Sequence, residues 1–339
     1  MVSKYHPDKY ADQISDAVLT EILKIDPNAH VACECLAKGT DVVLAGEITT
    51  TAEPDYEDIV RSVGNRLNYK VSRVTNLLTT QSPEIRNAVD SDKKIGAGDQ
   101  GMMFGFAVNG GKYYLPYGQE TAIDIIKLIE QDIEQNPDSI FLGDAKTQVT
   151  TDIDAPSYIK PVDTILISAC HKEGYTLSQV QDYIRALLRR NGIPEARNLL
   201  LNPAGVGTFG GPAADCGLTG RKIVCDQYGG YAPVGGGAFS GKDPSKVDRS
   251  GCYMARRIAV DMVRKHGYDT CTVQLAYAIG VSEPVSVDAV GLAGKDRFDV
   301  SEEVRTSYDL TPAGIIKSLG LLTLDYGRIS GGNHMIHFI

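Results

Sequence analysis

The stretch "GGGAFSGKDPSKVDRSG", Gly235–Gly251, places glycines next to two lysines and two aspartates within 17 residues. The spacing from Gly236 to Lys242 matches the G-x-x-x-x-G-K pattern of phosphate-binding loops. Asp243, however, stands where such a loop needs Ser or Thr to reach magnesium, and Pro244 removes a backbone amide. The stretch therefore predicts phosphate binding by another route, with a solvated charged loop as the alternative.

Four further stretches combine charges with turn-forming residues: "HPDK" at 6–9, "GAGDQG" at 96–101, "DAKTQVT" at 144–150 and "GGPAADCGLTGRKIVCDQYGG" at 210–230. Each alone is compatible with a helix cap, a turn or a surface strand. Together they supply cations and oxygen ligands in an acidic chain: Lys9, Lys146, Arg221, Lys222, Lys242 and Lys246, with Asp8 and Asp248. This set suits a polyphosphate with bound Mg²⁺, because magnesium takes one or two carboxylates together with phosphate oxygens.

The length of 339 residues favours two or three domains over a single core. Hydrophobic residues at 42% and charged residues at 23% are typical of a soluble globular protein, and the net charge of −9 argues against nucleic acid or membrane as a partner. Seven cysteines without a CxxC motif favour buried thiols over a zinc site. No charged-then-apolar leader and no apolar run near ~20 residues occur, so we expect a cytoplasmic protein.

Hydrophobic periodicity predicts alternating helices and paired strands. Helices are expected at residues 8–26, 56–69, 121–135, 177–192, 250–267 and 311–321, and strands at 30–37, 41–50, 105–110, 112–118, 146–153, 163–171, 196–205, 270–280 and 284–291. The first two strands are expected to form a hairpin, and the aperiodic segment 81–101 a functional loop. The pattern indicates α+β layers, although no internal sequence repeat supports a three-fold arrangement.

The stretches "HPDKYADQISDAVL", "GEITT", "GAGDQGMMFG", "GGPAADCGLTGRKI" and "GGGAFSGKDPSKVDRS" together strongly resemble the S-adenosylmethionine synthetase (methionine adenosyltransferase) family. The resemblance runs in order from about residue 5 to residue 320. It implies an α+β fold of three pseudo-symmetric α/β-layer domains, which we place at residues 1–90, 97–209 and 210–339, with the spatial domains interleaved in the sequence. It also implies dimers that pair through sheet faces and share active sites, and that can join into tetramers.

The family's reaction transfers the adenosyl group of ATP to the sulfur of L-methionine, and the released tripolyphosphate is hydrolysed to phosphate and pyrophosphate. A thioether is a modest, neutral nucleophile, so the reaction depends on stabilising the leaving group. Cations already fixed around the triphosphate stabilise the charge that develops on its bridging oxygen. Holding the sulfur in line with C5′ supplies the remainder, up to ~7–11 kcal/mol of proximity and orientation.

Residue by residue, the resemblance implies catalytic roles for His6, Lys146, Arg221 and Lys242. It implies that ATP is bound by His6, Asp99, Asp144, Lys146, Asp215, Arg221, Lys222, Ala238 and Lys242, and methionine by Glu47, Gln81, Asp215 and Lys246. The implied metals are Mg²⁺, two per site, with Asp8 and Asp248 as ligands, and K⁺ near Glu34. Structural alternatives remain open for three residues: a plain strand carboxylate for Glu34, a helix-dipole residue for Asp8 and a helix lead-in for His6.

The chain departs from the family pattern at four places. Tyr5 replaces the glycine before "HPDK", after a shortened "MVSK" segment. The gating loop that begins at residue 81 is shorter, and the tail after Leu322 diverges. "NPAGVGTFGGP" has Val206 and Gly207 where the family has an arginine and the phenylalanine that stacks on adenine.

Loss of an aromatic–base stack costs ~1–3 kcal/mol. Phe209 lies two residues after Gly207, and residues i and i+2 of a strand share a face, so we expect Phe209 to restore part of the stack and to contact ATP. Two alternatives to the synthetase reaction stay open. One is a tripolyphosphatase or a transferase with altered nucleotide choice, and the other is a non-catalytic homologue that serves as an oligomer partner.

Overall fold

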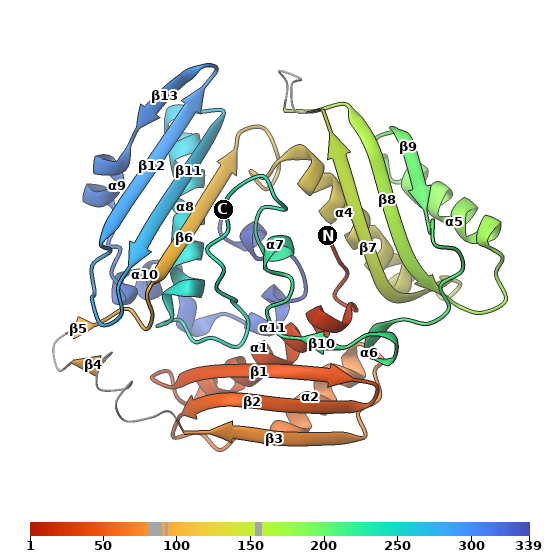
Figure 1. Ribbon diagram of the computed structural model, residues 1–339, viewed down its shortest axis with the longest axis horizontal. Helices are drawn as coiled ribbons and strands as arrows, with labels where there is room; N and C mark the ends of the chain where they lie inside the picture. The colour runs from red at the N-terminus through yellow and green to blue at the C-terminus, as the bar shows by residue number, and fades with distance from the viewer. Residues whose placement is uncertain (81–89, 92–93, 153–157) are drawn as a thin grey trace.

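The computed structural model describes residues 1–80, 90–91, 94–152 and 158–339. Three larger sheets surround a central group of helices, one sheet on each side of a roughly triangular molecule (Figure 1). Helices α1, α4 and α8 lie on the inner sides of these sheets. The fold is therefore the expected α+β arrangement, in which helices cover one face of each sheet.

The first sheet has the order β10-β1-β2-β3, with β1 at His30–Lys38, β2 at Asp41–Thr49, β3 at Arg73–Thr79 and β10 at Gly217–Leu218. The expected hairpin is confirmed, because β1 and β2 pair antiparallel from His30↔Thr49 to Lys38↔Asp41. Burial alternates along β1, so that Cys33 and Cys35 point into the core against α1, Pro7–Ile25, while Glu34 faces outward.

The second sheet has the order β13-β12-β11-β6 and combines distant parts of the chain. Strand β6, Gly101–Val108, pairs with β11, Thr270–Tyr277, and β12 and β13 follow at Ser286–Ala293 and Asp296–Asp299. Helix α8, Val247–His266, covers this sheet. A Cβ on Gly105 would lie only 1.9 Å from the carbonyl oxygen of Ala255, so glycine lets α8 approach β6 at this point.

The third sheet has the order β7-β8-β9, with strands at Phe141–Thr151, Val162–His171 and Ala196–Leu201. It packs on α4, Tyr117–Gln135, and α5, Leu177–Arg190, around a second, smaller core. The register of β7 against β8 shifts between Phe141 and Ala145. Strand β10 belongs to the first sheet and β6 to the second, so the sheets interleave along the sequence.

The remaining elements are short: α2 at Tyr56–Arg66, β4 at Asp90–Ser91, β5 at Lys94–Ile95, α6 at Gly211–Ala214, α7 at Ile223–Asp226, α9 at Ser301–Ser307, α10 at Pro312–Leu319, η1 at Leu321–Thr323, α11 at Tyr326–Ile329 and η2 at His334–His337. None of the helices in the described ranges is long and apolar enough to cross a bilayer.

Two expected strands differ from the structure. Residues 112–118 do not form a strand: they turn, with Tyr114 at a φ of 54° that is incompatible with extended backbone, and α4 begins at Tyr117 after Pro116. Strand β9 ends at Leu201 instead of residue 205, because Asn202 adopts a φ of 42° that is incompatible with extended backbone. The expectation that residues 207 and 209 share one face of a strand is therefore wrong, since neither residue lies in a strand.

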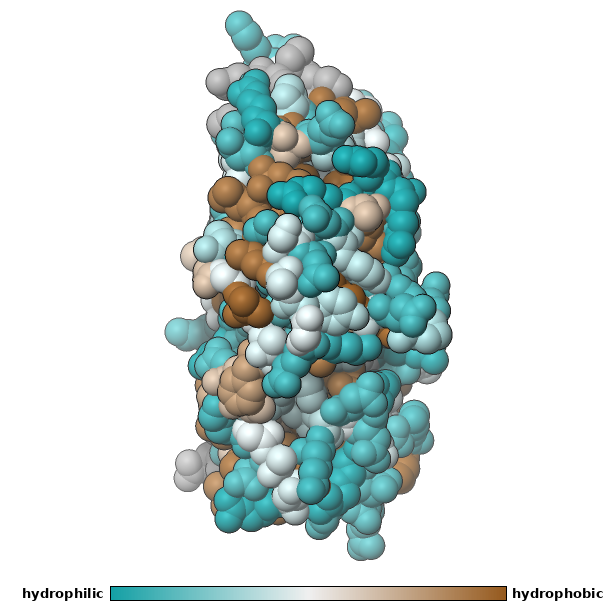
Figure 2. Space-filling view, turned by 90° about the vertical axis from the view of Figure 1, so that its right-hand side faces the viewer, coloured by the Kyte–Doolittle hydropathy of each residue, from teal (hydrophilic) through white to brown (hydrophobic). Residues whose placement is uncertain are grey.

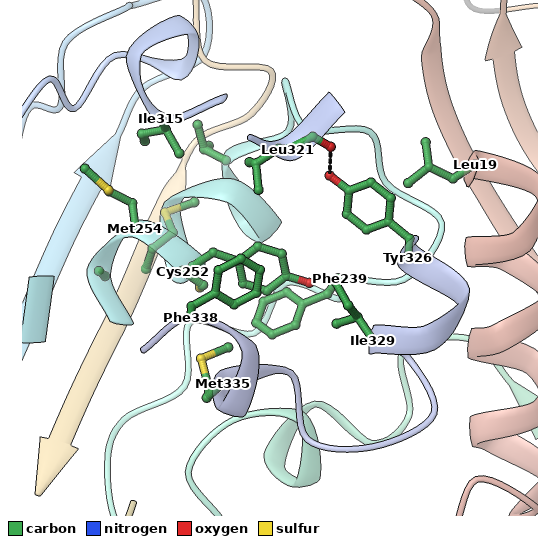
Figure 3. Packing of buried hydrophobic residues seen from close by; sticks show 14 of the residues in the cluster. Leu19, Phe239, Cys252, Met254, Ile315, Leu321, Tyr326, Ile329, Met335 and Phe338 are labelled. Carbon is green, nitrogen blue, oxygen red and sulfur yellow. Dashed lines mark hydrogen bonds between the residues drawn. The ribbon is translucent and has the colours of Figure 1, made fainter. Parts of the chain in front are cut away.

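The larger core joins the first sheet, the second sheet and the C-terminal segment. Figure 3 shows Met254 and Cys252 of α8 near Ile315 of α10, with Met335 and Phe338 of the C-terminal segment on the other side. The Tyr326 hydroxyl donates to the carbonyl of Leu321 at 2.6 Å (Figure 3). The divergent tail is thus part of the core and contributes to its burial.

Replacing Gly105 by alanine is expected to destabilise the protein by ~1–3 kcal/mol, because the new methyl group would force β6 and α8 apart. The shift of the urea unfolding midpoint measures this cost. Gly332→Ala is the matched control, since a Cβ there meets no atom within 4 Å. Equal midpoints for the two variants would show that the close approach of α8 to β6 is not required.

Candidate active site

The N-terminus of α1 carries two of the expected site residues. His6 is the N-cap and is 1% exposed, and its Nδ1 accepts a hydrogen bond from the Asp8 backbone N–H at 3.1 Å. Asp8 lies in the first turn, where an acid complements the helix dipole. The sequence motif places both groups at one helix end because Pro7 fits the first helical position.

The Asp8 carboxylate forms ion pairs with two cations of the segment after β10. Its Oδ2 lies 2.5 Å from Lys222 Nζ, and its Oδ1 lies 3.0 Å from Arg221 Nε. The Leu218 backbone N–H also donates to Oδ1 at 3.0 Å. Burial raises the pKa of Asp8, but hydrogen bonds from Lys222 and Leu218 and the two positive charges lower it overall.

Strand β7 brings the next members to the same place. Asp144 accepts a hydrogen bond from the Gly211 N–H at 2.9 Å, and Lys146 follows it on the outward face of β7. The charges of Lys146, Asp215 and Asp8 all act on Asp144, so these groups lie near one another. We call His6, Asp8, Asp144, Lys146, Asp215, Arg221 and Lys222 the first cluster.

The environment of the first cluster keeps His6 uncharged. The pKa of His6 is lowered to about 4, first because burial removes water and then because Lys222 and Lys146 repel a positive ring. Asp8 and Asp215 oppose this shift without overcoming it. Near neutral pH the imidazole is therefore neutral and can exchange hydrogen bonds without adding charge.

A second cluster forms around the stretch that opened the sequence analysis. Lys242 Nζ lies 2.5 Å from Asp248 Oδ2, and Lys246 Nζ lies 2.6 Å from Asp243 Oδ2. Burial raises the pKa of Glu34, while Lys242 and Lys246 act to lower it. The other expected members adjoin this group: Glu47 on β2 and Asp99 beside Gly98, which faces Lys246. We call Glu34, Glu47, Asp99, Lys242, Lys246 and Asp248 the second cluster.

Five of the six expected cations thus fall into two groups with different partners, whereas Lys9 is buried and pairs with Asp12 and Asp226. Lys222 pairs with Asp8, whereas Lys242 pairs with Asp248. Ala238, four residues before Lys242, packs against Gly220, two residues before Lys222. A Cβ on Gly220 would come within 2.5 Å of the Ala238 methyl group. A single chain therefore presents two charged groups, and the expected convergence of all cations in one cavity does not follow from the ion pairs within one chain.

Sequence reasoning missed the acids that hold these loops in place. Asp12 accepts the Gly220 N–H and Asp16 accepts the Gly241 N–H, each at 2.8 Å. Asp16 also pairs at 2.5 Å with Arg249, and neither side chain is exposed. The spacing of Asp8, Asp12 and Asp16 was the available signal, because residues four apart share one helix face.

Asp243 explains why the phosphate-loop pattern fails at its last position. Its carboxylate is 2% exposed and accepts hydrogen bonds from the backbone N–H groups of Val31 and Ser245 at 2.7 and 2.9 Å. Burial would raise the pKa of Asp243, but Lys246 and these hydrogen bonds lower it overall. Asp243 therefore has a structural role: its hydrogen bonds hold this loop against β1.

The carboxylates suit a metal that is bound mainly through its substrate. Within the described ranges, no group of three or more His, Cys, Asp or Glu side chains gathers as a preformed metal site. Asp8 and Asp248 instead provide one carboxylate in each cluster, each paired with lysine. This fits Mg²⁺, which often takes one or two carboxylates and completes its coordination with phosphate oxygens and water.

All of the expected ligand contacts remain predictions, including those of Gln81 and Phe209. Gln81 and most of the gating loop lie outside the described residues. Phe209 lies in the loop after β9 and is 67% exposed. It borders a cavity of about 560 Å³ that is also lined by Tyr69, Asp144 and Cys170, so its ring is free to contact a ligand near Asp144.

Comparisons with known proteins cover nearly all of the chain. The model of the S-adenosylmethionine synthetase N-terminal domain matches residues 1–93, that of the central domain 94–206 and that of the C-terminal domain 209–337. A solved structure of an unusual S-adenosylmethionine synthetase from Campylobacter jejuni is similar, with a TM-score of 0.88 and 31% sequence identity. The match covers 99% of this chain and 95% of that one.

Asp16→Asn is expected to lower the free energy of unfolding by ~3–5 kcal/mol, because Arg249 would keep a buried charge without its partner. Asparagine can still accept the Gly241 N–H, so the variant isolates the ion pair. Glu57→Gln is the control: it breaks the exposed pair of Glu57 with Arg61, worth ~0–1 kcal/mol. Urea unfolding compares the two, and equal losses would contradict a special role for the buried pair.

Proposed function

Because this chain belongs to the S-adenosylmethionine synthetase family, we propose that it transfers the adenosyl group of ATP to the sulfur of L-methionine. The tripolyphosphate is released and then hydrolysed to phosphate and pyrophosphate. One observation carries this proposal: Lys146, Arg221 and Lys222 gather with a neutral His6 at the end of α1. This is a cationic site for a polyphosphate beside an uncharged hydrogen-bonding group.

The cations act on the leaving group. In the displacement, the methionine sulfur attacks C5′ of ATP, and the C5′–O bond breaks with its electrons passing to the tripolyphosphate. Lys146, Arg221 and Lys222 stabilise the charge that develops on this oxygen. Asp8 holds two of these cations before substrate binds, so little reorganisation is needed during the reaction. His6, kept neutral, contacts the departing oxygen without competing for the phosphates.

The second cluster supplies the methionine end and the remaining cation. We assign Glu47, Gln81 and Lys246 to methionine together with Asp215 of the first cluster. Lys242 contacts the phosphates, and Asp99 and Ala238 face the nucleotide. Mg²⁺, held by Asp8 and Asp248, would neutralise phosphate charge, and K⁺ near Glu34 would complete the cofactors of the family.

Two copies of the chain form the complete site in this proposal. The two clusters have separate ion partners within one chain, and the sheets expose large apolar side chains suited to pairing. Examples are Leu36 and Leu77 of the first sheet at 40% and 59%, and Leu200 of the third at 46%. Figure 2 shows the right-hand side of the molecule in Figure 1, on which the third sheet lies. Hydrophobic residues reach the surface there among hydrophilic ones. Tetramers and a cytoplasmic location remain part of this proposal.

Incubation with ATP, methionine, Mg²⁺ and K⁺ tests the reaction, and a sulfonium product identified by mass spectrometry is the expected result. Phosphate release from added tripolyphosphate without sulfonium product would instead support a tripolyphosphatase. The absence of both would support a non-catalytic homologue. Lys222→Met and Lys242→Met should each lower kcat by ~10²–10³, because each removes one stabilising charge.

Mixing these two inactive variants tests the shared site. A mixed dimer combines an intact first cluster from the Lys242→Met copy with an intact second cluster from the Lys222→Met copy, so one of its two sites recovers. Activity of the mixture after subunit exchange is the expected result. If mixing restores nothing although mixed dimers form, the two clusters of one site come from the same copy.

A transferase with relaxed nucleotide choice is a second candidate, favoured by Val206 and Gly207 at the adenine-stacking position. Phe209 is proposed to replace part of the stack, so Phe209→Ala should raise the KM for ATP by roughly 5- to 150-fold, the equivalent of ~1–3 kcal/mol. Val285→Ala is the control, since this side chain is similarly exposed, at 63%, and belongs to neither cluster. An unchanged KM would contradict the stack, and similar kcat/KM for ATP and GTP would support relaxed choice.

A further inference from the structure

Tyr5 fills the seam between α1 and β7. It lies within the turn that the His6 N–H closes by donating to the Ser3 carbonyl at 3.0 Å, and it is only 4% exposed. The ring lies over Gly143, because a Cβ there would come within 2.7 Å of Tyr5 Cγ. Gly143 also has a φ of 117°, a conformation that other residues rarely adopt. The ring thus packs against Gly143, in a space that only glycine leaves open.

The same seam fixes the backbone of β7 where the site residues leave it. Ser3 Oγ donates to the Gly143 carbonyl at 2.8 Å and accepts the Ala145 N–H at 3.1 Å. These bonds span the irregular register of β7 between Phe141 and Ala145. The irregularity directly precedes Lys146, so contacts made by residues 3 to 5 hold the backbone next to this cation.

A second tyrosine links the seam to the segment that bears Asp215. The Tyr69 hydroxyl donates to the Tyr5 carbonyl, and a Cβ on Gly211 would come within 2.6 Å of this hydroxyl. The Gly211 N–H in turn donates to Asp144. The backbone of Tyr5 is therefore linked through Tyr69 to Gly211, and Gly211 in turn binds Asp144 of the first cluster.

We propose that Tyr5 is a positioning residue that fixes His6 relative to Lys146 by filling the seam against Gly143. The inference rests on the proposed function, and it answers why a bulky ring replaces glycine next to His6. The ring touches no reacting atom. Its effect comes from geometry, because a displacement of about 1 Å between catalytic groups can cost 10²-fold in rate.

Steady-state kinetics of Tyr5→Ala and Tyr5→Phe test this role, with rates expressed per folded protein below the thermal midpoint. Tyr5→Phe keeps the ring and should retain kcat within twofold. Tyr5→Ala should lower kcat at least tenfold, because His6 and Lys146 would no longer be held in their positions relative to each other. Gly143→Ala, which displaces the ring by added bulk, should lower kcat in the same way.

A readout that needs no reaction separates this inference from the proposed function. Calorimetric titration with inorganic tripolyphosphate should show at least tenfold weaker binding for Tyr5→Ala than for wild type, and unchanged binding for Tyr5→Phe. If the wild-type protein forms no sulfonium product, the proposed function is contradicted. The tripolyphosphate titration would still decide the role of Tyr5.

A purely structural Tyr5 would lower the thermal midpoint and leave both kcat and tripolyphosphate binding unchanged in the folded fraction, and that result would overturn the inference. If Tyr5→Ala does not fold, Tyr5→Leu fills the seam without a flat ring and takes its place under the same criteria.

Discussion

Helix α1 holds two distant loops through one stripe of carboxylates. Asp8, Asp12 and Asp16 lie one turn apart and accept backbone N–H groups from residues 218–220 and from Gly241. Backbone N–H groups removed from water need an acceptor, and an ionised carboxylate is a strong one. The loops that carry the cations of both clusters thus take their position from a single rigid helix.

Buried cations offset the electrostatic repulsion among the carboxylates of this stripe. Lys9 lies 3.0 Å from Asp12 and 2.6 Å from Asp226, and it is 1% exposed. Arg249 serves Asp16 in the same way. Removing such charges from water is costly unless they are paired and hydrogen-bonded, so the network tolerates few substitutions. The arrangement also explains how a chain of net charge −9 concentrates positive side chains locally. Some acids neutralise buried cations, whereas Lys146, Arg221 and Lys246 lie at the surface or in partly buried positions.

The interleaved sheets determine which loops meet. Strand β10 joins the first sheet at β1, and β6 joins the second at β11, so the chain crosses the centre of the molecule more than once. The first cluster consequently lies where α1, β7 and the segment after β10 come together. Glycines permit these close approaches, as at Gly143 under Tyr5, where any side chain would separate the elements.

The sequence by itself determined the helices with strong periodicity, the hairpin of β1 and β2, the family, and the residue types suited to a polyphosphate. These features are local or lie in contiguous motifs, so pattern and propensity suffice to identify them. It failed at residues 112–118 and 202–205, where Tyr114 and Asn202 adopt left-handed conformations that override strand propensity. Only the tertiary structure decided that the cations divide into two clusters, that Asp12 and Asp16 hold the loops, and that the ring of Tyr5 packs against Gly143. These outcomes depend on contacts between residues more than 100 positions apart, and such contacts are set by packing and by pairing of buried charges, which no local pattern encodes.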